Sequence, residues 1–257
     1  MTQTEIRAAL EARGLRPLRQ LGQNFLHDRN LAGWLAEQAL TGSFPGDEIV
    51  EIGPGLGALT AHLLERGARV VALEKDRGLC AFLRERFAGE IAAGRLDLRH
   101  VDALEVLPAL KPSVVCGNLP YYISTPLLME CLRLDAQRMF FVMQKEVGQR
   151  MASGPGGKVY GALSVLVQVA CEVRLVKTLP GSVFYPPPEV ESIAVLQQRR
   201  ENPPVAVKGR AAFAAFVQRG FSQRRKKLSN LLPVSDGRRA EHLSPAEWVE
   251  LWRSTIS

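Results

Sequence analysis

The sequence predicts an α/β protein with a parallel sheet, followed by a small all-α domain. Short apolar runs alternate with helix-like stretches over residues 48–143, which is typical of strand–helix–strand crossover units. The first apolar run ends in a glycine-rich turn, Gly53-Pro54-Gly55-Leu56-Gly57, and the sequence after Asn202-Pro203-Pro204 is basic and helical. We therefore expect one domain over residues 1–200 and a second over residues 201–257.

Each element is predicted from its length and hydrophobic period. Apolar runs predict strands at 48–52, 69–73, 96–101, 113–116, 139–143, 172–177 and 192–197. Helical patterns predict helices at 4–13, 28–40, 57–66, 77–87, 102–110, 125–134, 160–170, 211–219, 222–232 and 245–252. Asp28 is the expected N-cap of the helix that follows it, and residues 16–27 are expected to form a structured loop.

Composition narrows the class of protein. A chain of 257 residues, 46% hydrophobic and 23% charged, can bury a substantial core. No apolar run reaches the roughly 18 residues of a membrane span, and the N-terminal segment lacks the apolar centre of a signal peptide. We expect a cytoplasmic monomer with no membrane partner. The cysteines lack metal-ligand spacing, which predicts buried free thiols and no metal site: Cys80, Cys116, Cys131 and Cys171.

The positive charge is concentrated near the start of the second domain. Residues 199–230 hold nine lysines and arginines against one acid, Glu201, whereas the whole chain carries +7. A basic block of this density suits a polyanion such as nucleic acid, although a solvated helix face would show the same pattern.

Three strand ends carry the residues of a ligand site. Gly53 and Gly55 allow a tight turn and a close approach of the backbone to a ligand, and with Ala58 they also fit a dinucleotide fingerprint. Glu74 ends the second strand, where a carboxylate accepts hydrogen bonds from ribose hydroxyls. Asp102 follows the third strand, where it can accept from an adenine amine or simply cap a helix. Together they predict an adenosine-bearing cofactor, either NAD or S-adenosylmethionine.

The fourth strand end separates these two cofactors. No His, Lys or Ser stands there as a proton donor for hydride transfer. Asn118-Leu119-Pro120-Tyr121 instead resembles the signature of methyltransferases that act on planar exocyclic amines, above all that of adenine. This favours S-adenosylmethionine and leaves an NAD-dependent oxidoreductase supported by the glycine turn alone.

The whole chain resembles the KsgA/RsmA-type small-subunit rRNA adenine dimethyltransferases, a family related to the Erm resistance enzymes. The matching stretches run in family order: Gly22–Leu26, Glu51–Gly57, Asn118–Tyr121, Phe184–Ser192 and Phe221–Leu228. The resemblance implies a Rossmann-like class I S-adenosylmethionine-dependent methyltransferase with a seven-stranded sheet and a C-terminal helical lobe. It also implies that Asn24 and Leu26 fold over the cofactor, with Gly53, Glu74, Asp102 and Asn118 lining its site. Tyr122 departs from the family pattern of Asn or His.

The residues suggest how an adenine amine is methylated. The Asn118 side-chain oxygen and the Leu119 carbonyl are predicted to accept hydrogen bonds from the amine, and Pro120 stiffens the turn. Tyr121 and Phe184 are predicted to stack on the flipped base, although Phe184 also fits a core position. The predicted RNA phosphate contacts are Arg219, Arg224, Arg225, Lys226 and Lys227.

The favoured function is dimethylation of two adjacent adenosines near the 3′ end of small-subunit rRNA, with the small ribosomal subunit or its precursor as partner. The first alternative is an Erm-type enzyme that modifies large-subunit rRNA. A second, of another class, is a ribosome-assembly or transcription factor that keeps the fold without catalysis.

Overall fold

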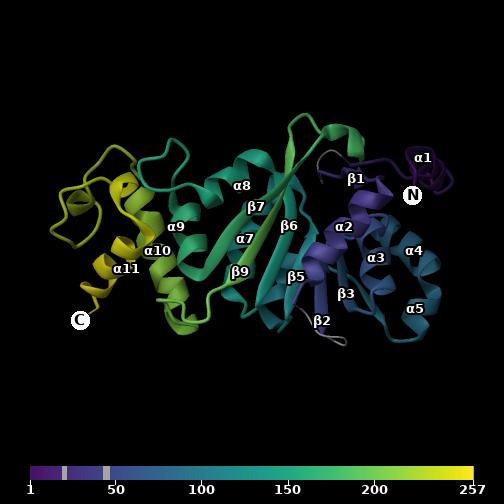
Figure 1. Ribbon diagram of the computed structural model, residues 1–257, viewed down its shortest axis with the longest axis horizontal. Helices are drawn as coiled ribbons and strands as arrows, with labels where there is room; N and C mark the ends of the chain where they lie inside the picture. The colour runs from purple at the N-terminus through teal and green to yellow at the C-terminus, as the bar shows by residue number, and fades with distance from the viewer. Residues whose placement is uncertain (19–21, 43–46, 257) are drawn as a thin grey trace. The chain divides into compact units, whose positions relative to one another are not determined.

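The computed structural model describes residues 1–18, 22–42 and 47–256 (Figure 1). Contacts between Cα atoms divide the chain into two compact units. Unit 1 comprises Met1–Lys145 and Val176–Leu196, and unit 2 comprises Glu146–Leu175 and Gln197–Ser257. Residues 146–175 are therefore grouped with the C-terminal helices, and the functional boundary near residue 200 stays a prediction.

A seven-stranded sheet in the order β4-β3-β2-β5-β6-β9-β7 confirms all seven predicted strands. Parallel pairing joins β2 to β3 and β5, β3 to β4, and β5 to β6. The chain runs outward from β2 to β4 and then returns to the other side of β2 as β5. The carboxyl ends of β2 and β5 therefore flank a point where the strand order reverses, which is where open α/β sheets bind ligands. The strands are β2 (Glu48–Ile52), β3 (Arg69–Glu74), β4 (Leu96–His100), β5 (Val114–Asn118), β6 (Arg138–Gln144), β7 (Cys171–Leu179) and β9 (Ser192–Arg199).

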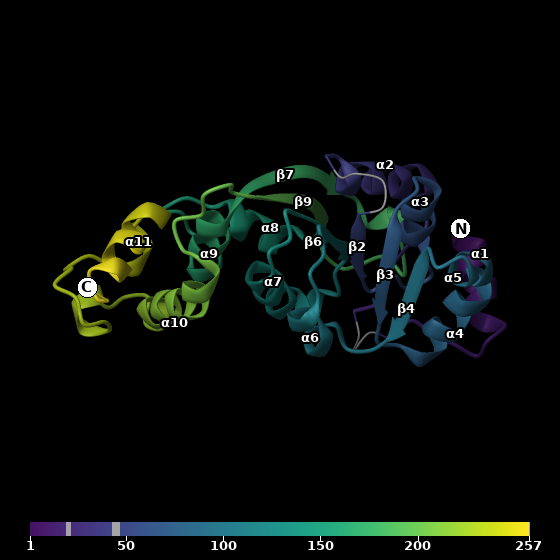
Figure 2. The same cartoon turned by 90° about the horizontal axis from the view of Figure 1, so that it is seen from below.

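Helices cover the sheet of unit 1 on both faces. Figure 2 shows α2 (Arg29–Leu40) and α3 (Ala58–Glu65) on one face and α7 (Ser124–Arg133) on the other. Asp28 is the N-cap of α2, as predicted, because its side chain accepts a hydrogen bond from the Leu31 amide at 2.9 Å. The remaining α-helices are α1 (Gln3–Glu11), α4 (Arg77–Arg86), α5 (Ala88–Ala92) and α6 (Ala103–Val106).

A two-residue ribbon that the sequence did not predict closes one side of unit 1. β1 (Phe25–Leu26) pairs antiparallel with β8 (Phe184–Tyr185), so that Phe25 lies opposite Tyr185 and Leu26 opposite Phe184. β1 falls in the segment 16–27 that was expected to be a loop; residues 19–21 of that segment lie outside the described residues. Strands this short have no hydrophobic period to detect.

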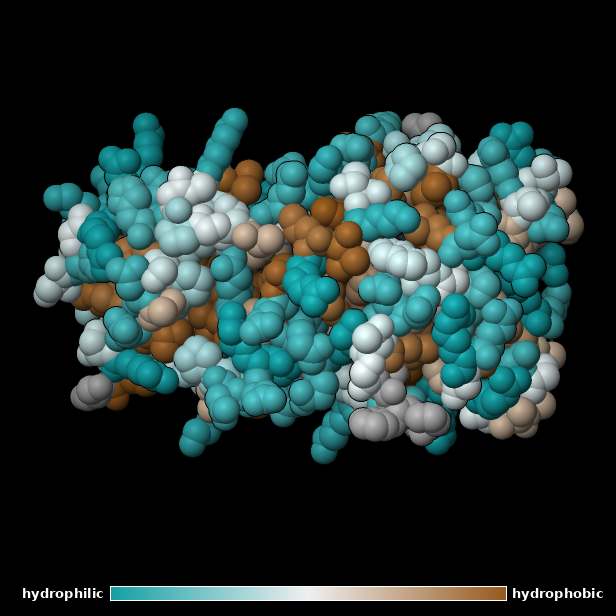
Figure 3. All heavy atoms as spheres, viewed as in Figure 1, coloured by the Kyte–Doolittle hydropathy of each residue, from teal (hydrophilic) through white to brown (hydrophobic). Residues whose placement is uncertain are grey.

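The helices of unit 2 are α8 (Lys145–Ala152), α9 (Ala162–Ala170), α10 (Arg210–Phe221) and α11 (Pro245–Arg253), and aromatic side chains pack α10 against α11. Trp248 is fully buried and stacks on Phe221, with 5.4 Å between the ring centroids. The Tyr160 hydroxyl donates a 2.7 Å hydrogen bond to the Leu243 carbonyl. Hydrophilic side chains project from the face around α10 and α11 in Figure 3, with apolar ones between them.

The helix predicted at residues 222–232 is wrong. Turns and a short 3-10 helix, Leu228–Asn230, take its place. The amides of Leu228 and Ser229 donate to the carbonyls of Arg238 and Asp236, at 2.8 and 2.9 Å, instead of to carbonyls four residues back.

Two further expectations concern the chain as a whole. The four cysteines are free and buried, as predicted. No helix in the described part of the chain is long and apolar enough to cross a membrane.

Candidate active site

A cleft opens in unit 1 at the carboxyl ends of β2, β3 and β5. It encloses about 1180 Å³ including its open mouth, which is ample for a nucleoside-bearing ligand. The structure brings most of the predicted site residues into its lining: Asn24, Leu26, Gly53, Gly55, Glu74, Asp102, Asn118, Pro120 and Phe184. Leu119 and Tyr121 do not belong to the lining, and Tyr122 does.

The glycine turn after β2 shapes the base of the cleft. Gly53 has φ +65° and no atom within 4 Å of the position that a Cβ would occupy, so its backbone faces open space. Gly55 has φ +60°, and a Cβ there would lie 3.1 Å from the Phe25 ring on β1. Both backbone conformations favour glycine. The turn therefore brings bare backbone to a ligand on one side and to the ribbon on the other.

The Glu74 carboxylate at the end of β3 holds this turn in place. Its Oε2 accepts from the Gly55 amide at 3.0 Å, and its Oε1 accepts from the Asp76 amide at 2.9 Å. Burial raises the pKa of Glu74 to about 7, against the lowering effect of these amides. Each oxygen keeps a lone pair that can accept from a hydroxyl of a ligand.

Sequence reasoning gave no role to Glu51, a second buried carboxyl in the cleft lining. Glu51 is 1% exposed, and the Thr60 hydroxyl donates to its Oε2 at 2.7 Å. Burial raises the pKa of Glu51 to about 7, partly offset by this hydrogen bond. A glutamate inside an apolar strand was the available signal, because such a residue is rarely buried without a partner.

Asp102 is engaged by its own surroundings. Its Oδ1 caps α6 by accepting from the Leu104 amide at 3.0 Å, and its Oδ2 pairs with Lys75 Nζ at 2.6 Å. The bond from Lys75 holds the pKa of Asp102 below its usual range. The helix-cap interpretation is thus confirmed, while a contact with an adenine amine stays a prediction that uses the remaining lone pairs.

The turn after β5 is fastened to the N-terminal arm. Asn118 Nδ2 donates a 2.8 Å hydrogen bond to the Asn24 carbonyl, and Asn24 Nδ2 donates to the Gly22 carbonyl at 3.1 Å. This orientation leaves Asn118 Oδ1 without a hydrogen bond to any described residue, at the wall of the cleft. An amide whose nitrogen is held and whose oxygen is open presents an acceptor to a ligand.

The residues that follow Asn118 take different positions. Leu119 is 1% exposed, and its amide donates to the Val142 carbonyl at 2.9 Å. Pro120 has φ −58° and lines the cleft. The Tyr121 hydroxyl lies 2.5 Å from Ser192 Oγ, which fixes its ring, whereas Tyr122 is 53% exposed and lines the cleft.

Phe184 closes the cleft from β8. Its side chain is 2% exposed, so the ring is buried in the core as well as lining the cleft. The alternative that Phe184 occupies a core position is therefore confirmed, and stacking of this ring on a base stays a prediction.

The basic segment of unit 2 contains two kinds of cation. Arg219, Arg225, Lys226 and Lys227 are exposed and form no ion pair with a described residue. Arg224 differs because it pairs with Glu241 at 2.9 Å and donates to the carbonyls of Lys158 and Tyr160 at 2.9 and 3.1 Å. Arg224 therefore ties parts of unit 2 together.

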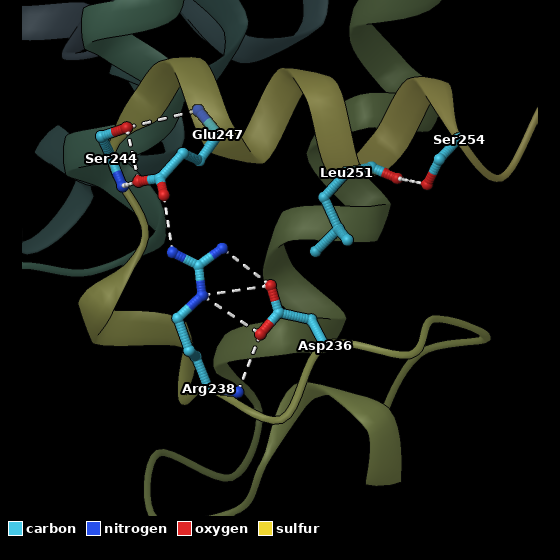
Figure 4. A network of polar contacts seen from close by, with 6 residues as sticks. All are labelled: Asp236, Arg238, Ser244, Glu247, Leu251 and Ser254. Carbon is cyan, nitrogen blue, oxygen red and sulfur yellow. Dashed lines mark hydrogen bonds and ion pairs between the residues drawn. The ribbon is translucent and has the colours of Figure 1, made fainter.

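A clamp that sequence reasoning missed supports the end of this segment. Figure 4 shows Arg238 between Asp236 and Glu247, at 2.8 and 2.6 Å. The same Glu247 completes the capping box of α11 with Ser244. Lys227, the last cation of the segment, pairs with Arg239 in an isolated β-bridge, directly beside the clamp residue Arg238.

Two crystal structures share the fold of this chain. The dimethyladenosine transferase from Plasmodium falciparum matches with a TM-score of 0.75 at 21% identity, covering 90% of this chain and 97% of that chain. The 23S rRNA methyltransferase ErmE matches with a TM-score of 0.68 at 23% identity, covering 91% and 100%.

The sequence comparisons go further. The family model described as ribosomal RNA adenine dimethylase matches residues 16–246. A ribosomal RNA small subunit methyltransferase A from Moorella thermoacetica is 43% identical over 245 residues, 88% of this chain and 82% of the relative. One from Xanthomonas campestris is 39% identical over 251 residues, 91% and 94% of the two chains. The chain belongs to the ribosomal RNA adenine dimethylase family, which confirms the resemblance seen in the sequence.

Proposed function

We propose that this protein transfers methyl groups from S-adenosylmethionine to the N6 amines of two adjacent adenosines near the 3′ end of small-subunit rRNA, giving dimethyladenosines during ribosome biogenesis. The observation that carries the proposal is the Asn118 amide, whose nitrogen is held by Asn24 and whose oxygen is open in the cleft. The names of the relatives support the choice of the small subunit.

The donor set of the cleft fits the cofactor. Glu74 offers carboxylate oxygens to ribose hydroxyls, Asp102 offers one to the adenine amine, and Gly53 presents bare backbone with open space beside it. Asn24 and Leu26 would close over the cofactor from the arm and the ribbon. When bound, S-adenosylmethionine supplies a methyl group that its sulfonium has already activated.

The protein's task at the target is to hold an amine and orient its lone pair. Asn118 Oδ1 and the Leu119 carbonyl would accept hydrogen bonds from the adenine N6 amine. Such contacts favour a pyramidal nitrogen, whose lone pair is no longer delocalised into the ring. The φ of Pro120, −58°, fixes the turn that carries both acceptors. After the transfer the methylated nitrogen carries an extra proton and is acidic, so the proton leaves to water and a strong general base is not required.

Aromatic rings would hold the flipped base. Tyr121 is oriented by its hydroxyl contact with Ser192, and Phe184 would face the base from β8. Tyr122, which the sequence left without a role, lies at the cleft wall and would border the same base. Stacking contributes about 1–3 kcal/mol per base.

The exposed cations of unit 2 would contact RNA phosphates: Arg219, Arg225, Lys226 and Lys227. Arg224 would contribute chiefly by holding unit 2 together, since its guanidinium is engaged by Glu241 and two carbonyls. Backbone contacts carry no base sequence, so recognition would depend on the shape of the RNA and the ribosomal particle. We propose that the protein acts as a cytoplasmic monomer without a metal.

A methyl-acceptor assay on undermethylated small and large subunits tests the proposed function. Transfer to small subunits alone is the expected result. Transfer to large subunits would point to an Erm-type enzyme, and transfer to neither would favour a non-catalytic assembly or transcription factor. Calorimetry with S-adenosylmethionine and with NAD checks the cofactor, and we expect binding of the former only.

A further inference from the structure

A second hollow in unit 1 lies between the C-terminal end of α1 and the β1–β8 ribbon. It encloses about 820 Å³ including its open side. Leu10 and Leu15 form part of its lining, which also carries two arginines, a glutamate and a tyrosine: Arg7, Arg16, Glu11 and Tyr185. We call this hollow the arm pocket.

The chain reversal after α1 gives the arm pocket a defined wall. Gly14 has φ +61°, and the Leu15 amide donates back to the Leu10 carbonyl at 2.9 Å. Leu10 is 3% exposed, so the reversal is packed on the core. Arg16 follows directly and is brought to the pocket by this turn.

The arm pocket and the cofactor cleft lie on opposite faces of one strand. Consecutive side chains of a strand point to opposite faces. Phe184 accordingly lines the cleft, and its neighbour Tyr185 lines the arm pocket. This ribbon, two residues long on each side, is what separates the cleft from the arm pocket.

The arm pocket offers the groups that recognise a nucleotide. Neither Arg7 nor Arg16 forms an ion pair with a carboxylate in the described ranges 1–18, 22–42 and 47–256, so both guanidiniums can receive a phosphate. The Arg7 guanidinium lies 5.0 Å from the centroid of the Tyr185 ring, which is half-buried and lines the pocket. Glu11 supplies an acceptor for a ribose hydroxyl or an exocyclic amine.

We propose that the arm pocket binds a ribonucleotide of the substrate RNA that flanks the target adenosine, with its phosphate on Arg16 and Arg7 and its base on Tyr185. This rests on the proposed function, because the flanking strand is that of the methylated RNA. Such a contact would hold the substrate RNA at an additional site, which is separate from the cofactor cleft and from the basic segment of unit 2.

The test compares Arg16→Gln, Tyr185→Ala and Tyr185→Phe with the wild type on undermethylated small subunits. Arg69→Gln is the matched control, because Arg69 is an exposed arginine at the amino end of β3. We expect Tyr185→Ala to weaken binding roughly tenfold while Tyr185→Phe keeps it. Arg16→Gln should lower the slope of log affinity against log salt by about 0.7, the value for one single-strand contact. The melting temperature and S-adenosylmethionine affinity of Arg16→Gln and Tyr185→Phe should match those of Arg69→Gln.

Three results would overturn the assignment. Arg16→Gln and Tyr185→Ala could bind and methylate as Arg69→Gln does, Tyr185→Phe could lose as much as Tyr185→Ala, or free adenosine monophosphate could displace the RNA at stoichiometric concentration. The last would make the arm pocket a site for free nucleotides. In each case the wild type still methylates the small subunit, whereas failure of the proposed function would appear as no transfer by the wild type itself.

Discussion

The cleft of unit 1 and the exposed cations of unit 2 use their polar side chains in opposite ways. In the cleft of unit 1, Glu74, Asp102 and the Asn118 amide nitrogen are each bound to a neighbour before any ligand arrives. In unit 2, Arg225, Lys226 and Lys227 are exposed and form no ion pair with a described residue. The first arrangement gives fixed geometry and the second gives a positive field. Substitutions in the cleft of unit 1 should therefore affect rate and cofactor binding, whereas substitutions of these exposed cations of unit 2 should affect salt-dependent affinity.

The largest effect is expected from Asn118→Ala. It removes the open acceptor in the cleft, and loss of one positioned polar group of this kind lowers kcat by about 10²–10³. Single-turnover kinetics on undermethylated small subunits measure the change. Asn30→Ala, an exposed asparagine on α2, is the control and should keep full activity. Unchanged turnover in Asn118→Ala would remove the basis of the proposed mechanism.

The next effect is expected in unit 2 when Arg225, Lys226 and Lys227 are all changed to Gln. Affinity for the small subunit should fall on the order of a hundredfold at low salt, with a shallower salt dependence. Arg224→Gln should instead lower the melting temperature, because Arg224 is held by Glu241 and by two carbonyls. Pelleting assays over a salt series distinguish the two variants. If Arg224→Gln lost as much salt dependence as the triple variant, Arg224 would be a phosphate contact and not a residue that stabilises unit 2.

A stability effect follows from Glu51. Its pKa is raised to about 7 by burial, so its contribution to the free energy of unfolding is fully present below the unfolded-state pKa of 4.5. That contribution is lost as the pH rises through about 7. Glu51→Gln keeps an acceptor for Thr60 and removes the charge, so it should be more stable than the wild type by roughly 3 kcal/mol above neutral pH and equal to it in acid. Denaturant unfolding at both pH values checks this, and equal stability above neutral pH would mean that burial does not raise the pKa of Glu51.

The smallest effect concerns Glu74 and the pH dependence of cofactor binding. Because the pKa of Glu74 is raised to about 7, its carboxylate becomes protonated just below neutral pH. A ribose needs the ionised form, so affinity for S-adenosylmethionine should fall roughly tenfold from about pH 8 to about pH 6. Calorimetry on the wild type and on Glu74→Gln measures this. The variant should bind weakly at both pH values, and a pH-independent wild type would exclude Glu74 as the ribose acceptor.

Much of the fold was predictable because its signals are local. All seven sheet strands were found from apolar runs, and the glycine turn marked the end of β2. The helix at 222–232 was wrong because pairing with residues 236–239 overrides a local helical pattern, and distant pairing leaves no trace in a short window. The β1–β8 ribbon was missed for the same reason.

The same distinction between local signals and distant contacts applies to the candidate site. Residues at strand ends, such as Gly53, Glu74 and Asn118, could be placed at one edge of the sheet from topology alone. The hydrogen bonds that Asn118 and Asp102 already form could not be predicted, because their partners, the Asn24 carbonyl and Lys75 Nζ, come from other segments of the chain. The structure places Tyr122 in the cleft lining, where Tyr121 was expected. Tyr121 is held instead by Ser192, a residue far away in the sequence, and a local pattern cannot reveal such a contact.

The most direct measurement is mass spectrometry of rRNA 3′ fragments after undermethylated small subunits have been incubated with the protein and S-adenosylmethionine. Dimethylation of two adjacent adenosines, abolished by Asn118→Ala, is the predicted result. An unmodified 3′ fragment, or methylation that survives Asn118→Ala, would contradict the account.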